Sequence, residues 1–163
     1  MTPLATNLLA AANSAGVCSA YYKLCGEYPF ISGSNTKKLP YKEILGAANG
    51  KILLSKLRGP GTVFQVEGLP KTISINFIIQ TGGAIETDFL ISEAEREHRS
   101  TFAILCSEAL KQAELPAPKP AYPRPVCSSA SDMVAAFVRL QELALTLAET
   151  TKITTSGFGV EQP

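Results

Sequence analysis

Two alternating runs on either side of Gly82-Gly83 constrain the fold most strongly. In each run, every second residue belongs to one face. These face residues are Ile73, Ile75, Phe77 and Ile79 in the first run and Ile85, Thr87, Phe89 and Ile91 in the second. A period of two is typical of a β-strand with one buried side. The runs therefore predict an antiparallel hairpin over residues 72–91.

The length of the loop decides which residues of this hairpin face each other. A two-residue Gly82-Gly83 loop would place Phe77 opposite Asp88, a carboxylate on the apolar face, which the sheet would not tolerate. A three-residue loop instead places Phe77 opposite Phe89 or Thr87. Such loops usually need a residue with positive φ, which glycine adopts most easily. We therefore expect a bulged hairpin with Gly83 or Gly82 at positive φ. Its outward face then carries Asn76, Gln80, Glu86 and Asp88.

A helix is expected to follow the hairpin directly. Ser92 and Glu95 have the spacing of a capping box, in which each residue bonds the other's backbone N–H. Residues with helical spacing then run from Ala94 through His98 to Ala113, and Pro116 ends the segment. This spacing predicts a long helix that packs on the hairpin.

The remaining segments complete an α+β fold with one domain over residues 1–149. Thr2-Pro3 is a good helix start and Gly26 a good helix end. The other expected elements are a short helix from Pro40 to about Ala48, strands over 51–57 and 62–68, a proline-rich connector over 116–128, and a final helix from Ser129 or Ser131. Together these segments predict N-terminal helices, a four-stranded antiparallel β-meander, and two C-terminal helices packed on one sheet face. A flexible polar tail is expected over 150–163.

The composition narrows the classes of function. The chain has 163 residues, 45% hydrophobic and 18% charged, as in an ordinary folded domain. A net charge of +1 gives no overall field for nucleic acid, and no apolar run reaches the roughly 20 residues that span a bilayer. The four scattered cysteines suggest neither a disulfide framework nor a zinc site. We therefore expect a cytoplasmic protein without a metal or cofactor.

A few residues offer catalytic chemistry. His98 is the sole histidine, and its place on an apolar stripe favours a structural role. Glu86 and Asp88 share the outward strand face with Asn76, where paired carboxylates bind Mg²⁺ or act as acid and base in some enzymes. Cys127, just before a helix start, is the strongest candidate for a reactive thiol. A small enzyme that uses Glu86 and Asp88 is thus one hypothesis, although a solvated face is more usual.

Charge is unevenly distributed along the chain. Residues 37–58 hold six bases and one acid, whereas residues 86–114 hold seven acids and three bases. Lys37, Lys38, Lys42 and Arg58 are therefore candidates for binding an anion, a nucleotide or another small ligand. The segment does not match the phosphate-binding P-loop pattern. It also lacks the aromatic residues typical of RNA recognition, so nucleic acid is a less favoured partner.

The final helix supplies the leading hypothesis. Its apolar stripe includes Met133, Phe137 and Leu140, and the terminal helices together present more apolar surface than a small sheet is expected to cover. Surplus apolar surface usually marks a partner or self-association face. We therefore expect a non-enzymatic protein-binding module, of the regulator, inhibitor, immunity or chaperone type, which binds another protein or forms a homodimer.

Overall fold

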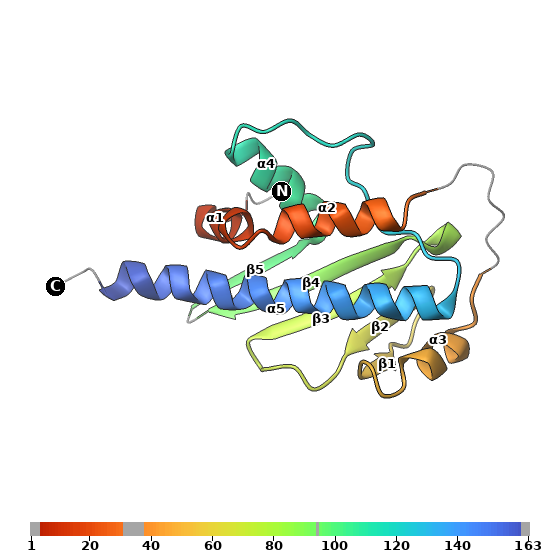
Figure 1. The fold of residues 1–163 in the computed structure, drawn as a ribbon. Helices are drawn as coiled ribbons and strands as arrows, with labels where there is room; N and C mark the ends of the chain where they lie inside the picture. Colours follow the sequence, from red (N-terminus) through yellow and green to blue (C-terminus); the bar gives the residue numbers. More distant parts are fainter. Residues whose placement is uncertain (1–3, 31–37, 94, 161–163) are drawn as a thin grey trace.

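The computed structural model describes residues 4–30, 38–93 and 95–160. Within these ranges the chain is an α+β domain, and Figure 1 shows its helices on one face of a single sheet. The helices are α1 (Thr6–Ser14), α2 (Val17–Glu27), α3 (Tyr41–Ala48), α4 (Phe102–Gln112) and α5 (Ala130–Val160). The strands are β1 (Leu54–Lys56), β2 (Thr62–Val66), β3 (Ile73–Ile79), β4 (Ile85–Glu93) and β5 (Arg96–Thr101). They form one antiparallel meander in chain order.

The central hairpin has the predicted register. Phe77 faces Thr87, and Gln80 N–H donates to the Ala84 carbonyl at 2.8 Å, which leaves a three-residue loop. Both loop glycines have positive φ, 85° at Gly82 and 89° at Gly83. The bulged hairpin is therefore confirmed.

The helix expected from Ser92 is wrong over its first part, because the chain forms a fifth strand there. Ser92 pairs with Glu97 across a tight β4–β5 turn. His98 and Ser100 alternate inward and are buried, so sheet pairing prevails over local helix preference. Helix α4 begins only at Phe102, after Thr101, whose Oγ1 accepts from Ile104 N–H at 3.3 Å.

The predicted N-terminal helix is divided into two. Gly16 adopts φ 69°, a left-handed conformation that ends α1 and allows α2 to start in a new direction. Helix α2 then runs through Gly26 to Glu27, one residue beyond the predicted end. Thr2 and Pro3 lie outside the described residues.

The apolar face of α5 packs on the sheet, as expected for a C-terminal helix. Phe137 stacks on Phe77 with ring centroids 4.3 Å apart and also contacts Phe64. Met133, Phe137 and Leu140 are fully buried. The prediction that they form a partner interface is therefore wrong, since they lie in the core of the domain itself. The helix also continues beyond residue 149 to Val160, and Thr151 is buried at 0% exposure.

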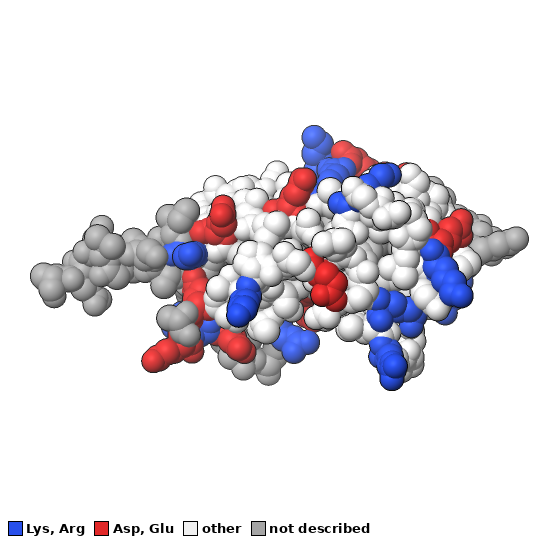
Figure 2. Space-filling view, turned by 90° about the horizontal axis from the view of Figure 1, so that it is seen from below, with Lys and Arg blue, Asp and Glu red and all other residues white. Residues whose placement is uncertain are grey.

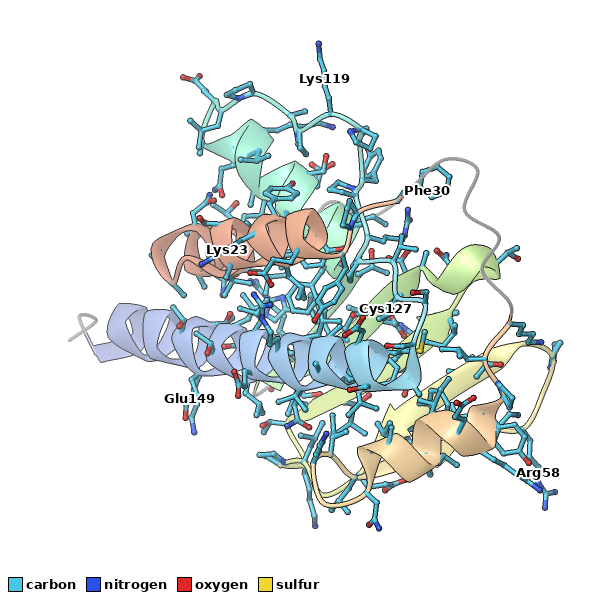
Figure 3. All side chains as sticks on the ribbon, turned by 45° about the vertical axis from the view of Figure 1, so that its right-hand side comes forward. Lys23, Phe30, Arg58, Lys119, Cys127 and Glu149 are labelled. Atoms are coloured by element: carbon cyan, nitrogen blue, oxygen red, sulfur yellow. A yellow bond between two sulfur atoms is a disulfide. The ribbon has the colours of Figure 1, made fainter. Side chains whose placement is uncertain are left out.

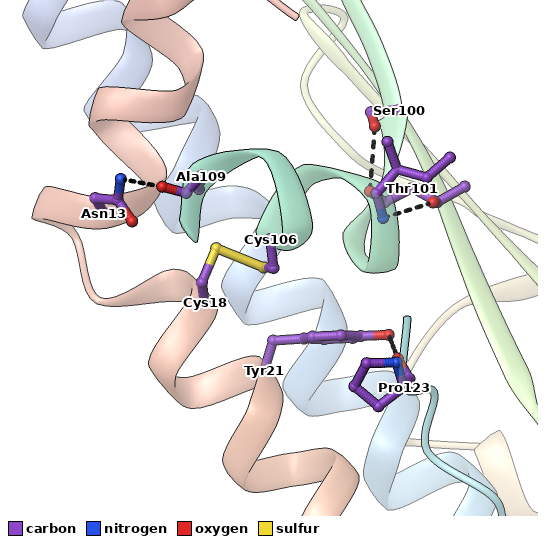
Figure 4. Close-up of a disulfide and its surroundings, with 9 residues drawn as sticks. Asn13, Cys18, Tyr21, Ser100, Thr101, Cys106, Ala109 and Pro123 are labelled. Carbon is purple, nitrogen blue, oxygen red and sulfur yellow. Dashed lines mark hydrogen bonds between the residues drawn. A yellow bond between two sulfur atoms is a disulfide. The ribbon is translucent and has the colours of Figure 1, made fainter. Parts of the chain in front are cut away.

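A disulfide joins two helices at one corner of the domain (Figure 4). Cys18 of α2 bonds Cys106 of α4 across 88 residues of sequence. Nearby, Asn13 Nδ2 donates to the Ala109 carbonyl at 3.0 Å, and Tyr21 O–H donates to the Pro123 carbonyl at 2.8 Å. The expectation of no disulfide is wrong, because spacing along the chain does not reveal which helices meet.

The C-terminal end of the proline-rich connector lies against the start of β4. Val126 forms a β-bridge with Ala84, and its N–H donates to the Tyr28 carbonyl at 2.8 Å. Arg124 forms an ion pair with Glu86. The connector thus links α2 to the sheet and positions the first turn of α5.

Candidate ligand pocket

A cavity of about 260 Å³ lies at the end of the sheet where the β3–β4 turn meets the start of α5. Leu39, Ile79 and Met133 provide apolar wall, while Thr62, Gln80 and Thr81 provide polar groups. Lys38 supplies a cation, and Gly61, Gly82, Gly83 and Cys127 complete the lining. An apolar wall with a few convergent polar groups is the usual composition of a small-molecule site.

The glycine turn brings the backbone of the hairpin against that of the connector. Cys127 N–H donates to the Gly83 carbonyl at 3.0 Å, and Gly83 N–H donates to the Gln80 carbonyl at 3.1 Å. A Cβ at position 83 would overlap the Cys127 carbonyl oxygen. Glycine is therefore required here, and at this position it adds only main chain to the lining of the cavity.

Two positive features border the cavity. Lys38 is exposed, and the first turn of α5 contributes Met133 to the lining. Ser129 caps this helix, with its Oγ accepting from Asp132 N–H at 3.1 Å. A helix start attracts negative charge, as a lysine does, although the carboxylate of Asp132 offsets part of that attraction. The anionic part of a ligand is therefore best placed on the Lys38 side.

Cys127 does not provide a reactive thiol in this cavity. Its side chain is buried, and burial raises the pKa of the thiol to about 12, with the nearby charge of Asp132 adding to the rise. Nucleophilic attack needs the thiolate, so a thiol with this pKa is inert near neutral pH. The hypothesis of a reactive Cys127 is not supported.

Of the three predicted anion-binding residues that the structure describes, one reaches the cavity. Lys38 lines it, whereas Lys42 is exposed on α3 and Arg58 extends away from the β1–β2 turn (Figure 3). Lys37 lies outside the described residues. Figure 2 shows lysine and arginine side chains gathered toward the end of the molecule that carries α3.

The two carboxylates of the polar sheet face, Asp88 and Glu86, each pair with a different arginine. Asp88 faces Asn76 in the register and pairs with Arg99 at 3.2 Å. Glu86 faces Ile78 instead, is 7% exposed, and pairs with Arg124. Because each carboxylate has its own arginine, the two do not form a shared acid–base or metal site.

His98 also has a structural environment. Its Nε2 lies 3.0 Å from Oε2 of Glu93, and the His98 side chain is 3% exposed. Elsewhere in the described chain, no group of three or more His, Cys, Asp or Glu side chains is arranged to hold a metal ion. None of the helices described there combines the length and apolar character needed to cross a membrane.

Comparison with known proteins adds no functional analogy. No family model matches the chain, and neither curated proteins nor solved structures give a match. The functional argument therefore depends on geometry. The sequence indicates the glycine turn and Lys38, but it does not place them beside Cys127 and Met133, because the connector that leads to these two residues has no periodicity.

Proposed function

We propose that this protein binds a small molecule with an anionic group in the cavity beside the β3–β4 turn. The observation that carries the proposal is the convergence of Lys38, three polar side chains and an apolar wall around one cavity. Lys38 and the start of α5 would attract a carboxylate or phosphate, while Leu39, Ile79 and Met133 would contact an apolar part.

The size of the cavity restricts the ligand class. Its volume of about 260 Å³ is below the roughly 300–1,000 Å³ of typical drug-sized sites. A short carboxylic acid or a small phosphorylated metabolite fits this volume better than a nucleotide does. The proposal thus keeps the small-ligand hypothesis from the sequence and restricts the ligand to small acids and small phosphorylated molecules.

Thermal unfolding with a panel of small carboxylates and phosphates tests the proposal. A ligand that binds only the folded protein raises the melting temperature with concentration. Lys38→Ala should abolish the rise caused by a panel member. Lys42→Ala is the matched control, because it removes the same charge from an exposed position outside the cavity. An unchanged melting temperature across the panel, or equal losses in both variants, would contradict the proposal.

Binding to another protein is a second proposal, in which the binding surface does not lie on the helices. The apolar stripe of α5 is used inside the domain, but Figure 1 shows no helix on the opposite face of the sheet within the described chain. That face and the outer edge of β5 are the surfaces left for a macromolecular partner. A catalytic role for Glu86 and Asp88 is less favoured, because each carboxylate is held by an arginine.

The compartment is also open to test. A cytoplasmic location followed from the expectation that the cysteines are reduced, and the Cys18–Cys106 disulfide now favours an oxidising compartment. Mass spectrometry of protein alkylated immediately on cell lysis would decide. Alkylation of Cys18 and Cys106 would support the cytoplasm, and their protection until reduction would support an oxidising compartment.

A further inference from the structure

Strand β5 forms an outer edge of the sheet with backbone groups that lack a partner strand. Within the described residues it pairs with β4 alone. Arg96 and Glu97 are exposed, and the Arg99 side chain is 71% exposed. A strand edge of this kind is a template for pairing with another chain unless something prevents it.

The backbone bonds identify which β5 residues point outward. Ser92 N–H donates to the Thr72 carbonyl at 2.7 Å, so Ser92 directs its backbone toward β3. Its β5 partner is Glu97, and opposed residues in an antiparallel pair either bond each other or both point away. Glu97 therefore directs its N–H and C=O away from β4. Because this direction alternates, Arg99 and Thr101 do the same.

We infer that this edge pairs with the β5 edge of a second copy of the chain, in the register that places Glu97 opposite Arg99. A two-fold axis would then pass between the two His98 residues. Glu97 of each copy would face Arg99 of the other, so one strand pair would contain two identical ion pairs. The two sheets would join into one continuous antiparallel sheet.

The charges select this register from the few that the backbone allows. A register that overlaps all six β5 residues is excluded. It would place a residue whose backbone N–H and C=O point outward opposite a residue whose backbone groups already bond β4. Two registers overlap five residues. One sets Arg99 against Arg99, a like-charge pair, and the other sets Glu97 against Arg99 twice. Opposite charges directly across an antiparallel pair are favourable and like charges are not.

Charged side chains on a strand edge also discourage pairing with unrelated chains. Charged side chains have that effect in any order along the strand. The order Glu97-His98-Arg99 is complementary to itself when reversed, which is the property a two-fold pairing requires. A second copy is therefore the occupant that this edge fits.

A pair of charge-reversal variants tests the register. Glu97→Arg alone would set Arg against Arg99, and Arg99→Glu alone would set Glu97 against Glu. Each variant alone should be monomeric in analytical ultracentrifugation, while the unchanged protein should be dimeric. An equimolar mixture should form a 1:1 heterodimer, because both ion pairs are restored, one with its original charges and one with the charges exchanged. Dimers of either variant alone, or an unchanged protein that is monomeric at every concentration, would overturn the inference.

Hydrogen exchange of the unchanged protein provides a test that needs no variant. This independence is useful because the Arg99→Glu variant also loses the ion pair with Asp88, and circular dichroism must first show that the variant is folded. In the unchanged protein, the N–H groups of Glu97 and Arg99 should become more protected as protein concentration rises. The N–H of Arg96, which directs toward β4, should not change. Equal, concentration-independent exchange at the three positions would contradict pairing through β5.

Discussion

The corner with the disulfide and the corner with the cavity are organised in opposite ways. At the first corner, α2 and α4 are joined by a covalent bond, and side-chain hydrogen bonds link α1 to α4 and α2 to the connector. At the second corner, the β3–β4 turn and the start of α5 meet through the backbone of Gly83 and Cys127. The residues there surround a space of about 260 Å³.

This difference separates stability from binding. The disulfide corner is packed and cross-linked, so changes there should alter the free energy of unfolding with little effect on a ligand. The cavity corner has unfilled volume, which stabilises nothing by itself and is retained where a ligand is to enter.

Removal of the disulfide should cause the largest loss of stability. The bond closes a sequence separation of 88 residues, for which chain entropy predicts a loss of about 4.6 kcal/mol in the free energy of unfolding. Urea unfolding of the Cys18→Ser/Cys106→Ser double variant measures the loss. Reductant should destabilise the original protein and leave the double variant unchanged. An original protein whose urea midpoint is the same with and without reductant would show that the corner is not cross-linked.

Gly83→Ala should destabilise the cavity corner by about 2–4 kcal/mol. The substitution combines a strained positive φ, which costs about 1–2 kcal/mol, with overlap of the new Cβ and the Cys127 carbonyl. Gly50→Ala is the control, since Gly50 has φ 79° and nothing within 4 Å of its Cβ position. Urea unfolding should give a larger loss at Gly83 than at Gly50. Equal losses would mean that the hairpin and connector are not in close contact.

Thr101→Ala should cost about 1 kcal/mol, the usual value for loss of a helix N-cap. Ser92→Ala is the comparison, because Ser92 is a strand residue here and caps no helix. Urea denaturation distinguishes the observed start of α4 from the start that the capping-box pattern predicts. A larger loss at Ser92 than at Thr101 would support a helix beginning at Ser92.

The two buried free thiols should have no effect at neutral pH, where they stay protonated, but they should cause a decline of stability in alkali. Burial raises the pKa of the thiol to about 11 at Cys25 and about 12 at Cys127. Between the unfolded thiol pKa near 9 and these values, the unfolded chain releases a proton that the folded chain keeps. Stability should therefore be complete below pH 9 and fall as the pH rises toward 12. Urea unfolding of Cys127→Ala should show a shallower decline, and an identical slope would contradict a buried Cys127 thiol.

The sequence predicted those parts of the fold that have a strong local period. The hairpin register followed from alternation around Gly82-Gly83, and the α5 stripe that contains Phe137 followed from helical spacing. The β5 strand was missed because Ser92 and Glu95 mimic a helix start, and because pairing with β4 is not visible in the residues of β5 themselves.

The candidate site was less predictable than the fold. Lys38 was named from its charge, but nothing in the sequence related it to Cys127 or Met133, which reach the cavity through the irregular connector. The predicted interface on α5 failed because a broad apolar stripe is the same whether it meets its own sheet or a partner. Depth of burial, which distinguishes the two, is a property of the folded chain.

The most direct test of the cavity proposal is a ¹H–¹⁵N chemical-shift titration with a mixture of small carboxylates and phosphates. Binding as proposed should shift the amide signals of Thr62 and of the Gln80–Gly83 turn, and these shifts should disappear in Lys38→Ala but persist in Lys42→Ala. Unshifted spectra, or shifts confined to the outer sheet face around Asn76, would contradict the assignment of this cavity as the binding site.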